Sequence, residues 1–198
     1  MDIQSYCEKL GSTSPAPGGG SAAGIVLSLA ASCIEKSIRF SIKDDNEFVG
    51  KTETIRKSGL ELSNMDQTAF NNWSDARKLP KENDEQKEYR KNKINELIID
   101  CINVPAGICK KSVELMEMAF EFLPVCNKFL VSDVAVGASF CFSAFESGIF
   151  NIMINLPYLK NEEMKKDFLE YIEKSTGRMK ELRDNILSEC SERINSST

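Results

Sequence analysis

Two long stretches that are apolar on nearly every side constrain this chain more than any other feature. The first runs from Ser21 to Phe40 and is apolar on all sides in its first half, and the second runs from Ser132 to Asn155. A helix that is apolar all round belongs in the centre of a helical array or in a subunit interface. A chain of 198 residues struggles to hide two such helices by itself, so we expect subunits that interlock as a homodimer.

The remaining segments also carry helical patterns. We expect helices over about 3–10, 51–77, 85–122 and 162–193, with Pro105 marking a kink or break in the third of them. No stretch shows the sustained period-two alternation of a strand. The connections between these segments are too short to separate domains. The sequence therefore predicts one all-α domain over residues 1–198, built as a multihelical array.

The absence of histidine limits the chemistry. Without it the chain lacks the commonest metal ligand, the usual general base and every Ser-His or Cys-His nucleophile pair. The seven cysteines include no CxxC pair, and most lie in apolar stretches, which is typical of reduced core thiols in a cytoplasmic protein. Acid–base chemistry must therefore use carboxylates, lysines, tyrosines or cysteines.

The net charge and the amino-terminal sequence argue against two classes of partner, nucleic acids and membranes. The formal net charge of −5 comes from intermixed acids and bases, which argues against nucleic-acid binding. The amino-terminal residues show no signal-peptide pattern, and the longest uncharged apolar stretch, Val134 to Phe145, is short for a membrane span. We expect a soluble cytoplasmic protein with no membrane partner.

The segment from Ser14 to Ser21, SPAPGGGS, joins a stiff prolyl approach to three glycines and a helix amino terminus. Such a loop can present bare backbone N–H groups to an anion or a polar ring. It equally fits a tight helix cap with Ser21 near the cap position. Spacing alone does not choose between these interpretations.

Two aspartates are candidates for chemistry. Asp66 falls inside the apolar arc of its helix, where burial raises a carboxyl pKa toward the range of a general acid or base, although a neighbouring helix terminus or lysine could also satisfy it. Asp133 stands at the start of the second apolar helix, where capping is the stronger generic interpretation. Along that helix, Asn151 and Asn155 end a polar stripe and are candidates for contacting a heterocycle.

Six motifs in order carry a resemblance to a known family. They are SPAPGGGSAAG at 14–24, Asp66 with Ala69-Phe70, KLPK at 78–81, Val104-Pro105, Asn127 followed by Ser132-Asp133, and Phe150-Asn151 followed by Ile154-Asn155-Leu156. Together they resemble the cyclodeaminase/cyclohydrolase family, which comprises the carboxy-terminal domain of formiminotransferase-cyclodeaminase and the stand-alone methenyltetrahydrofolate cyclohydrolases. The resemblance covers nearly the whole chain.

The resemblance implies an intertwined, multihelical homodimer that binds a reduced folate around the Pro-Gly-rich loop, with no metal or redox cofactor. It implies an enzyme of one-carbon metabolism, either a formiminotetrahydrofolate cyclodeaminase, which we place first, or a methenyltetrahydrofolate cyclohydrolase; a folate-binding relative without turnover is the remaining alternative. Asp66 or Asp133 would move the proton. The folate would be held by Ser14, Pro17, Gly18, Gly19, Gly20, Ser21, Lys43, Asn127, Asn151 and Asn155.

Overall fold

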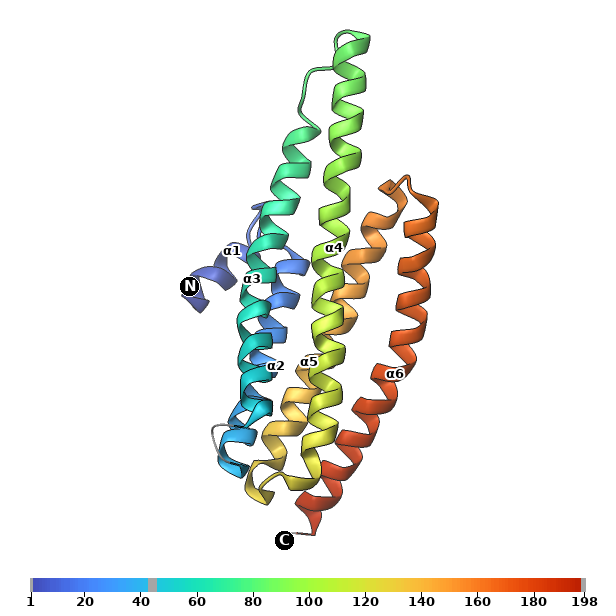
Figure 1. Cartoon of the computed structure of the whole chain (residues 1–198). Helices are drawn as coiled ribbons and strands as arrows, with labels where there is room; N and C mark the ends of the chain where they lie inside the picture. Colours follow the sequence, from blue (N-terminus) through green and yellow to red (C-terminus); the bar gives the residue numbers. More distant parts are fainter. Residues whose placement is uncertain (1, 43–45, 197–198) are drawn as a thin grey trace.

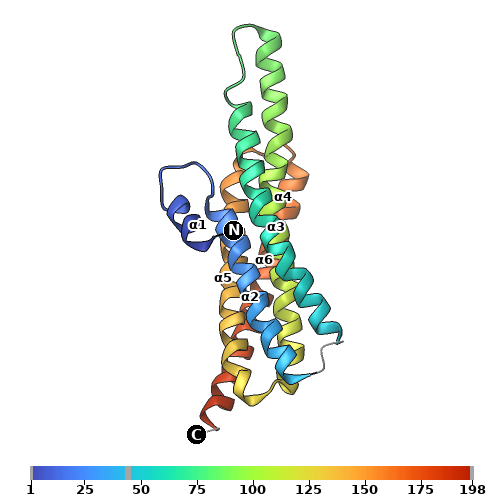
Figure 2. The same cartoon turned by 90° about the vertical axis from the view of Figure 1, so that its left-hand side faces the viewer.

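The computed structural model describes residues 2–42 and 46–196. Over these residues the chain forms an elongated bundle of α-helices and contains no strand (Figures 1 and 2). The α-helices are α1 (Ile3–Leu10), α2 (Gly19–Ser41), α3 (Glu47–Ala76), α4 (Asp84–Phe122), α5 (Val131–Asn155) and α6 (Glu162–Asn195), with the short 3₁₀ turns η1 (Leu123–Val125), η2 (Lys128–Leu130) and η3 (Leu156–Tyr158). The prediction of an all-α fold is confirmed.

Side-chain caps explain where most of the helices begin. Asn46, Asn83 and Asn161 each accept a hydrogen bond from a backbone N–H in the first turn of α3, α4 and α6. Helix α2 differs, because its N-cap is Gly18 and no side chain caps it. The helix starts two residues before Ser21, so the interpretation of Ser21 as the capping residue is wrong.

Helix α4 is continuous where the sequence left a break open. It runs for 39 residues, about 58 Å at 1.5 Å per residue, and remains helical through Pro105. The break considered at Pro105 is therefore absent. The start of α4 and the end of α3 extend beyond the other helices as a hairpin (Figure 1).

Helix α2 lies at the centre of the bundle, packed against α3, α4 and α5, while α6 covers α4 and α5 on the outside (Figures 1 and 2). Its side chains Leu27, Ile34 and Ile38 have no exposed surface. The central position predicted for this helix is confirmed. All seven cysteines are free thiols, and five of them are buried.

Helix α5 is strongly apolar but only partly covered. Two segments, Gly19–Ser41 and Lys128–Tyr158, are long and apolar enough to cross a membrane by length and composition, contrary to the expectation that no segment reaches a membrane span. Within its apolar 18-residue stretch, 67% of the α2 segment is buried inside the bundle, as in a core helix, whereas the corresponding share of the segment around α5 is 44%. The apolar side of α5 is therefore the face that a single chain leaves open.

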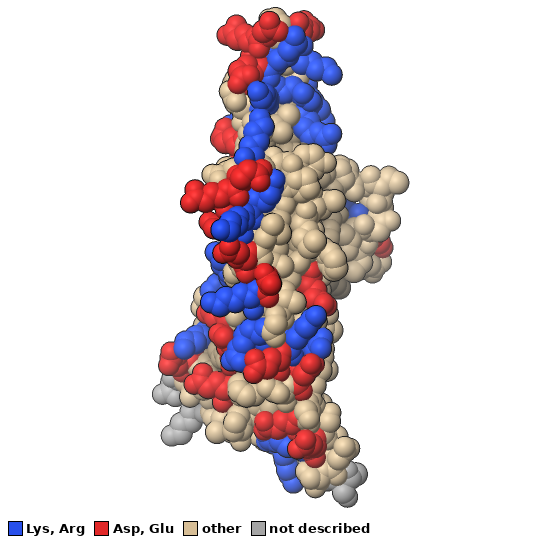
Figure 3. All heavy atoms as spheres, turned by 90° about the vertical axis from the view of Figure 1, so that its right-hand side faces the viewer, with Lys and Arg blue, Asp and Glu red and all other residues tan. Residues whose placement is uncertain are grey.

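Positive and negative side chains are mixed over the surface seen in Figure 3. Acidic and basic groups are interspersed along the face shown in Figure 3, beside a broad uncharged area. Most ion pairs join residues three or four positions apart on one helix, such as Lys57 with Glu53 and Lys165 with Glu162. Pairs of this kind are typical of solvated helix surfaces.

Candidate functional site

A cavity of about 150 Å³ lies where the glycine-rich loop meets α3, α4 and α5. The loop and the start of α2 form one wall, and the other helices supply side chains of both polar and aromatic character. The lining residues are Pro15, Ala16, Gly18, Gly19, Gly20, Asp66, Gln67, Phe70, Trp73, Cys101, Asn151, Ile154 and Asn155. The fold thus brings together six of the residues predicted to form the site: Gly18, Gly19, Gly20, Asp66, Asn151 and Asn155.

The amino terminus of α2 opens toward this cavity. Among the described residues, the backbone N–H groups of Gly19 and Gly20 have no hydrogen-bond acceptor. Ser14 Oγ donates to the carbonyl of Ala16 at 2.7 Å and so holds the preceding loop. Uncapped N–H groups at a helix start form a partial positive charge that attracts an anion or an electron-rich ring atom.

Glycine at position 20 is a steric requirement of the site. A Cβ atom there would overlap the carboxylate of Asp66. A Cβ at Gly19 would instead meet Asn151 Nδ2 at 3.5 Å, which is an ordinary contact. The carboxylate on α3 therefore packs directly against the backbone of the first turn of α2.

Asp66 is the carboxyl group that lines the cavity. Burial raises its pKa from the usual value, and the backbone N–H of Ser21 offsets part of that rise. No Lys or Arg side chain of the described residues forms an ion pair with Asp66, so the lysine partner considered from sequence is not observed. The other alternative, a neighbouring helix terminus, is the arrangement found.

The hydroxyl of Ser21 is occupied by protein contacts. It lies 3.0 Å from Tyr6 Oη and 2.8 Å from Ser63 Oγ, and it accepts a hydrogen bond from Gln67 Nε2 at 3.2 Å. The residue is fully buried. Ser21 therefore ties α1, α2 and α3 together, and its side chain is not open to a ligand.

The two asparagines line the cavity from α5. Asn151 Nδ2 donates to the carbonyl of Ser147 at 2.7 Å, and Asn155 Nδ2 donates to the carbonyls of Cys101 and Asn151. These bonds use the amide nitrogens. The side-chain oxygens have no partner among the described residues and can accept hydrogen bonds from a bound molecule.

Other predicted site residues lie elsewhere. Asp133 lies in the first turn of α5 but does not cap it, and its carboxylate pairs with Lys36 at 2.9 Å. Lys36 is 15 residues beyond Ser21 on α2, about 22 Å along the helix. Within one chain, Asp66 and Asp133 therefore cannot act on the same atom.

Asn127 also lies at the far end of α2. Its backbone N–H donates to Ser41 Oγ at 2.8 Å, and its side chain accepts from the N–H of Phe129 at 3.1 Å. Ser14 and Pro17 support the loop without lining the cavity. Lys43 lies outside the described residues.

Seven lining residues were not among those predicted to form the site: Pro15, Ala16, Gln67, Phe70, Trp73, Cys101 and Ile154. Phe70 and Trp73 lie on the same apolar arc as Asp66, but apolar side chains on such an arc are ordinarily core residues. Cys101 carried no signal of its own, because it belongs to another helix. Burial, followed by the charge of Asp66, raises the pKa of its thiol to about 11, so it is un-ionised at neutral pH.

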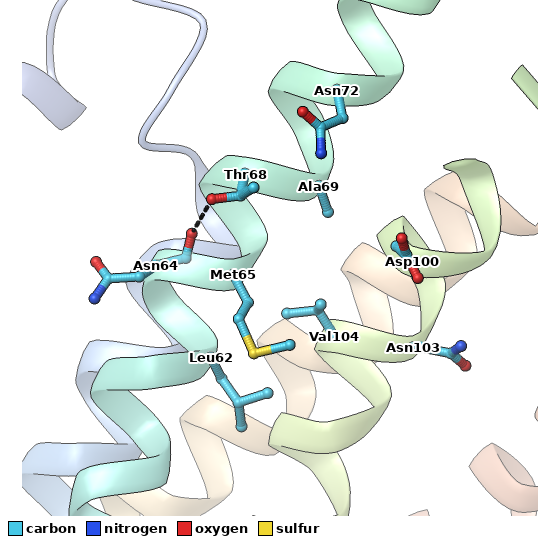
Figure 4. A pocket seen from close by; sticks show the side chains of 9 residues that line it. All are labelled: Leu62, Asn64, Met65, Thr68, Ala69, Asn72, Asp100, Asn103 and Val104. Carbon is cyan, nitrogen blue, oxygen red and sulfur yellow. Dashed lines mark hydrogen bonds between the residues drawn. The ribbon is translucent and has the colours of Figure 1, made fainter. Parts of the chain in front are cut away.

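A larger cavity of about 400 Å³ lies between α3 and α4 (Figure 4). Its only ionisable side chain is Asp100, which is exposed, and Thr68 donates to the Asn64 carbonyl at 3.1 Å. The lining residues are Leu62, Asn64, Met65, Thr68, Ala69, Asn72, Asp100, Asn103 and Val104. It lacks a buried ionisable group and contains no predicted site residue, so the smaller cavity is the better candidate for chemistry.

The helical bundle and its histidine-free cavity define a class of protein in which a half-buried carboxyl group faces a glycine-rich helix start that no side chain of its N-cap residue caps. Comparison with known families specifies the class further. Residues 2–174 match the model of the family described as formiminotransferase-cyclodeaminase. The chain belongs to this family.

Individual relatives are distant. The chain is 24% identical to a methenyltetrahydrofolate cyclohydrolase of Methylorubrum extorquens, over 98% of this chain and 97% of that protein. It is 27% identical to a formimidoyltransferase-cyclodeaminase of Gallus gallus, over 83% of this chain but 32% of that protein. The chain thus spans about a third of the length of the latter relative.

The fold is also found in a solved structure. The crystal structure of formiminotetrahydrofolate cyclodeaminase from Thermotoga maritima superposes with a TM-score of 0.85, covering 97% of this chain and 96% of that chain at 20% identity. At this identity the match supports the fold alone. It agrees with the all-helical architecture described above.

Proposed function

We propose that this protein is a formiminotetrahydrofolate cyclodeaminase, which converts 5-formiminotetrahydrofolate into 5,10-methenyltetrahydrofolate and ammonia. One observation carries the proposal: Asp66 is a half-buried carboxyl group without an ion-pair partner among the described residues, and it lines a cavity together with the uncapped start of α2. Membership of the family supports a folate as the substrate. Within the family, the domain shared with the formimidoyltransferase-cyclodeaminases supports this reaction.

The reaction needs one proton to move between two nitrogens. N10 of the folate attacks the formimino carbon on N5, a new N10–C bond forms, and the N10 proton must leave. The formimino group enters as its protonated cation, so its nitrogen already carries two hydrogens. Asp66 in its ionised form takes the N10 proton and returns it to that nitrogen, whose bond to carbon breaks as ammonia departs and the positive charge stays on the methenyl product. A carboxyl group whose pKa is raised by burial is suited to both transfers near neutrality.

The product is a cation, and the site is built to tolerate it. The 5,10-methenyl group is an amidinium, and the carboxylate regenerated on Asp66 stabilises its positive charge in a partly desolvated cavity. The side-chain oxygens of Asn151 and Asn155 would accept hydrogen bonds from the pterin. The scheme uses a carboxyl group and the folate's own nitrogens, so it calls for no cofactor.

The cavity is small for the whole substrate. Its volume of about 150 Å³ is below the 300–1,000 Å³ of a typical site for a drug-sized molecule. We propose that it holds the pterin and the one-carbon unit, while the rest of the folate lies along the surface. We also propose that the working form is a soluble, cytoplasmic homodimer.

Methenyltetrahydrofolate cyclohydrolase is the second candidate. The observation that favours it is the match to the Methylorubrum extorquens cyclohydrolase, which spans nearly the full length of both chains. In this reaction water adds to the methenyl carbon and the ring opens to 10-formyltetrahydrofolate. The same carboxyl group would take one proton from water and give it to N5 as the N5–C bond breaks, while the remaining hydroxyl proton is lost to solvent as the formyl C=O forms.

The ultraviolet absorbance of 5,10-methenyltetrahydrofolate separates these functions. Its appearance from 5-formiminotetrahydrofolate would establish the cyclodeaminase, and accelerated decay of added methenyl compound would establish the cyclohydrolase. We expect Asp66→Asn to lower kcat by roughly 10²–10⁴. Asp75→Asn, which changes an exposed carboxylate on the same helix, should leave kcat unchanged. If neither substrate reacts faster than in buffer, catalysis on these folates is refuted and a folate-binding relative becomes the better description.

Thermal unfolding shows whether the Asp66 variant is folded. The pKa of Asp66 is raised in the folded protein, so its ionisation destabilises the fold as pH rises through the unfolded value of about 4. Asparagine removes that cost. We expect Asp66→Asn to have a higher Tm than the unsubstituted protein at neutral pH. This difference in Tm should shrink below about pH 4, where neither side chain is charged. If the folded Asp66→Asn variant is as active as the unsubstituted protein at every pH, Asp66 takes no part in the mechanism.

A further inference from the structure

One face of α3 carries an ordered row of side chains that begins in the cavity and leads out of it. The row consists of Asp66, Phe70, Trp73 and Arg77, at positions i, i+4, i+7 and i+11. At 100° per residue the four fall within an arc of about 60°. The first three line the cavity, and Arg77 follows directly after the end of the helix.

Trp73 connects the cavity to Arg77. The Arg77 guanidinium lies over the indole ring, 4.7 Å from its centroid. The ring also packs against Tyr158 at 5.7 Å and Phe70 at 6.4 Å between centroids, and only 9% of Trp73 is exposed. Its Nε1–H is buried without an acceptor among the described residues. A buried donor without a partner is uncommon in a native protein and is consistent with a place where a ligand completes the site.

Arg77 is a cation without an acidic partner. No carboxylate of the described residues lies within 4.0 Å of its guanidinium, which is held instead by the indole. The adjacent Lys78 pairs with Asp75 at 2.7 Å and is thereby compensated. Arg90 donates to the Arg77 carbonyl at 3.2 and 2.9 Å, which brings a second guanidinium close by. The end of the row is thus a place of uncompensated positive charge.

The order of groups along the row is complementary to a reduced folate. A carboxylate suits the pterin and its one-carbon cation, aromatic side chains suit the aminobenzoyl ring, and a guanidinium suits a carboxylate. The rise from residue 66 to residue 77 is about 16 Å along the helix, and the Arg77 guanidinium lies over the ring of Trp73, one turn nearer the cavity. Resting on the proposed function, we propose that Arg77 binds the glutamate carboxylate of the folate while Trp73 packs against its aminobenzoyl ring.

Two ligands that differ only in the glutamate test this assignment. Binding of tetrahydrofolate and of tetrahydropteroate, which lacks the glutamate, is measured by calorimetry for the unsubstituted protein, Arg77→Gln and Lys78→Gln. A charge-assisted hydrogen bond contributes about 1.5–3 kcal/mol, so Arg77→Gln should weaken tetrahydrofolate binding by roughly 10- to 100-fold. Its Kd for tetrahydropteroate should not change. Lys78→Gln removes the same charge one residue away and should change neither Kd.

The only tryptophan of the sequence reports on the second half of the proposal. Either ligand should change the fluorescence of Trp73, and Trp73→Phe, which keeps an aromatic ring but removes the N–H, should weaken binding of both ligands. Equal loss of affinity for both ligands in Arg77→Gln, or no loss for either, overturns the role of Arg77. An unchanged fluorescence at saturation overturns that of Trp73. If the unsubstituted protein binds neither ligand, the proposed function itself fails, and the assignment of both residues fails with it.

Discussion

At the scale of single residues, the site depends on what is missing as much as on what is present. Asp66 approaches the start of α2 because Gly20 has no side chain, and α2 starts with free N–H groups because Gly18 offers no capping atom. Both features lie in the run of three glycines from 18 to 20. The glycines are therefore not equivalent, and their substitutions should differ.

We expect Gly20→Ala to displace the Asp66 carboxylate and to lower kcat by at least tenfold, about 1.4 kcal/mol of transition-state stabilisation. Gly19→Ala is the matched control, because its Cβ would lie at ordinary contact distance from Asn151. Steady-state kinetics with the reactive folate measures both variants. Similar activity in the two would mean that the overlap at position 20 is relieved without moving Asp66.

At the scale of elements, α2 and α3 are held together by a close backbone approach. A Cβ on Gly59 would lie 2.8 Å from the carbonyl oxygen of Gly24, and a Cβ on Gly24 would lie 2.7 Å from that of Gly59. Both contacts are with backbone, which cannot rotate away. This approach places Ser63 beside Ser21 and Asp66 beside Gly20, so the helix crossing also sets the geometry of the site.

Gly59→Ala should therefore force the two helices apart and lower the free energy of unfolding by roughly 1–3 kcal/mol. Gly50→Ala lies on the same helix with nothing within 4 Å of its Cβ. It should be neutral or stabilising by up to about 1 kcal/mol, because alanine favours the helix. Denaturant unfolding measures both, and a loss in Gly50→Ala equal to that in Gly59→Ala would contradict the explanation by close approach.

At the scale of the whole molecule, α2 and α5 share an uncovered apolar face. The ion pair between Lys36 on α2 and Asp133 on α5 lies on this face, so residues on the same side of either helix as these two also belong to it. Leu29 lies seven residues before Lys36, and Val136 and Phe140 lie three and seven residues after Asp133, so all three share it. They are 46%, 45% and 39% exposed. A second copy of the chain would cover such a face, as we propose for the homodimer.

Val136→Asp should convert the dimer into a monomer, because it places a charge within an apolar contact. Leu169→Asp is the control, since Leu169 is similarly exposed but lies on α6. Analytical ultracentrifugation measures the mass of each. A monomeric unsubstituted protein at micromolar concentration, or a dimer in Val136→Asp, would count against this interface. Binding of the unsubstituted monomer to lipid vesicles would instead point to a membrane contact.

Local sequence patterns were sufficient to predict the helices and part of the site. Helical periodicity and the absence of strand patterns predicted the all-α fold, and the apolar arc around Asp66 identified the carboxyl group that lines the cavity. Asn151 and Asn155 followed from their spacing along one helix. These features depend on residues close together in sequence, where geometry follows from the helix repeat alone.

Only the tertiary structure decided which of the candidates share a site. Asp66 and Asp133 were both candidates for the proton transfer, but packing places one in the cavity and the other in an ion pair at the far end of α2. Cys101 joins the cavity, and Ser21 turns into the core, because α4 and α1 pack where they do. The physical reason is that contacts between helices depend on crossing points such as Gly24 with Gly59, and these require two distant segments at once.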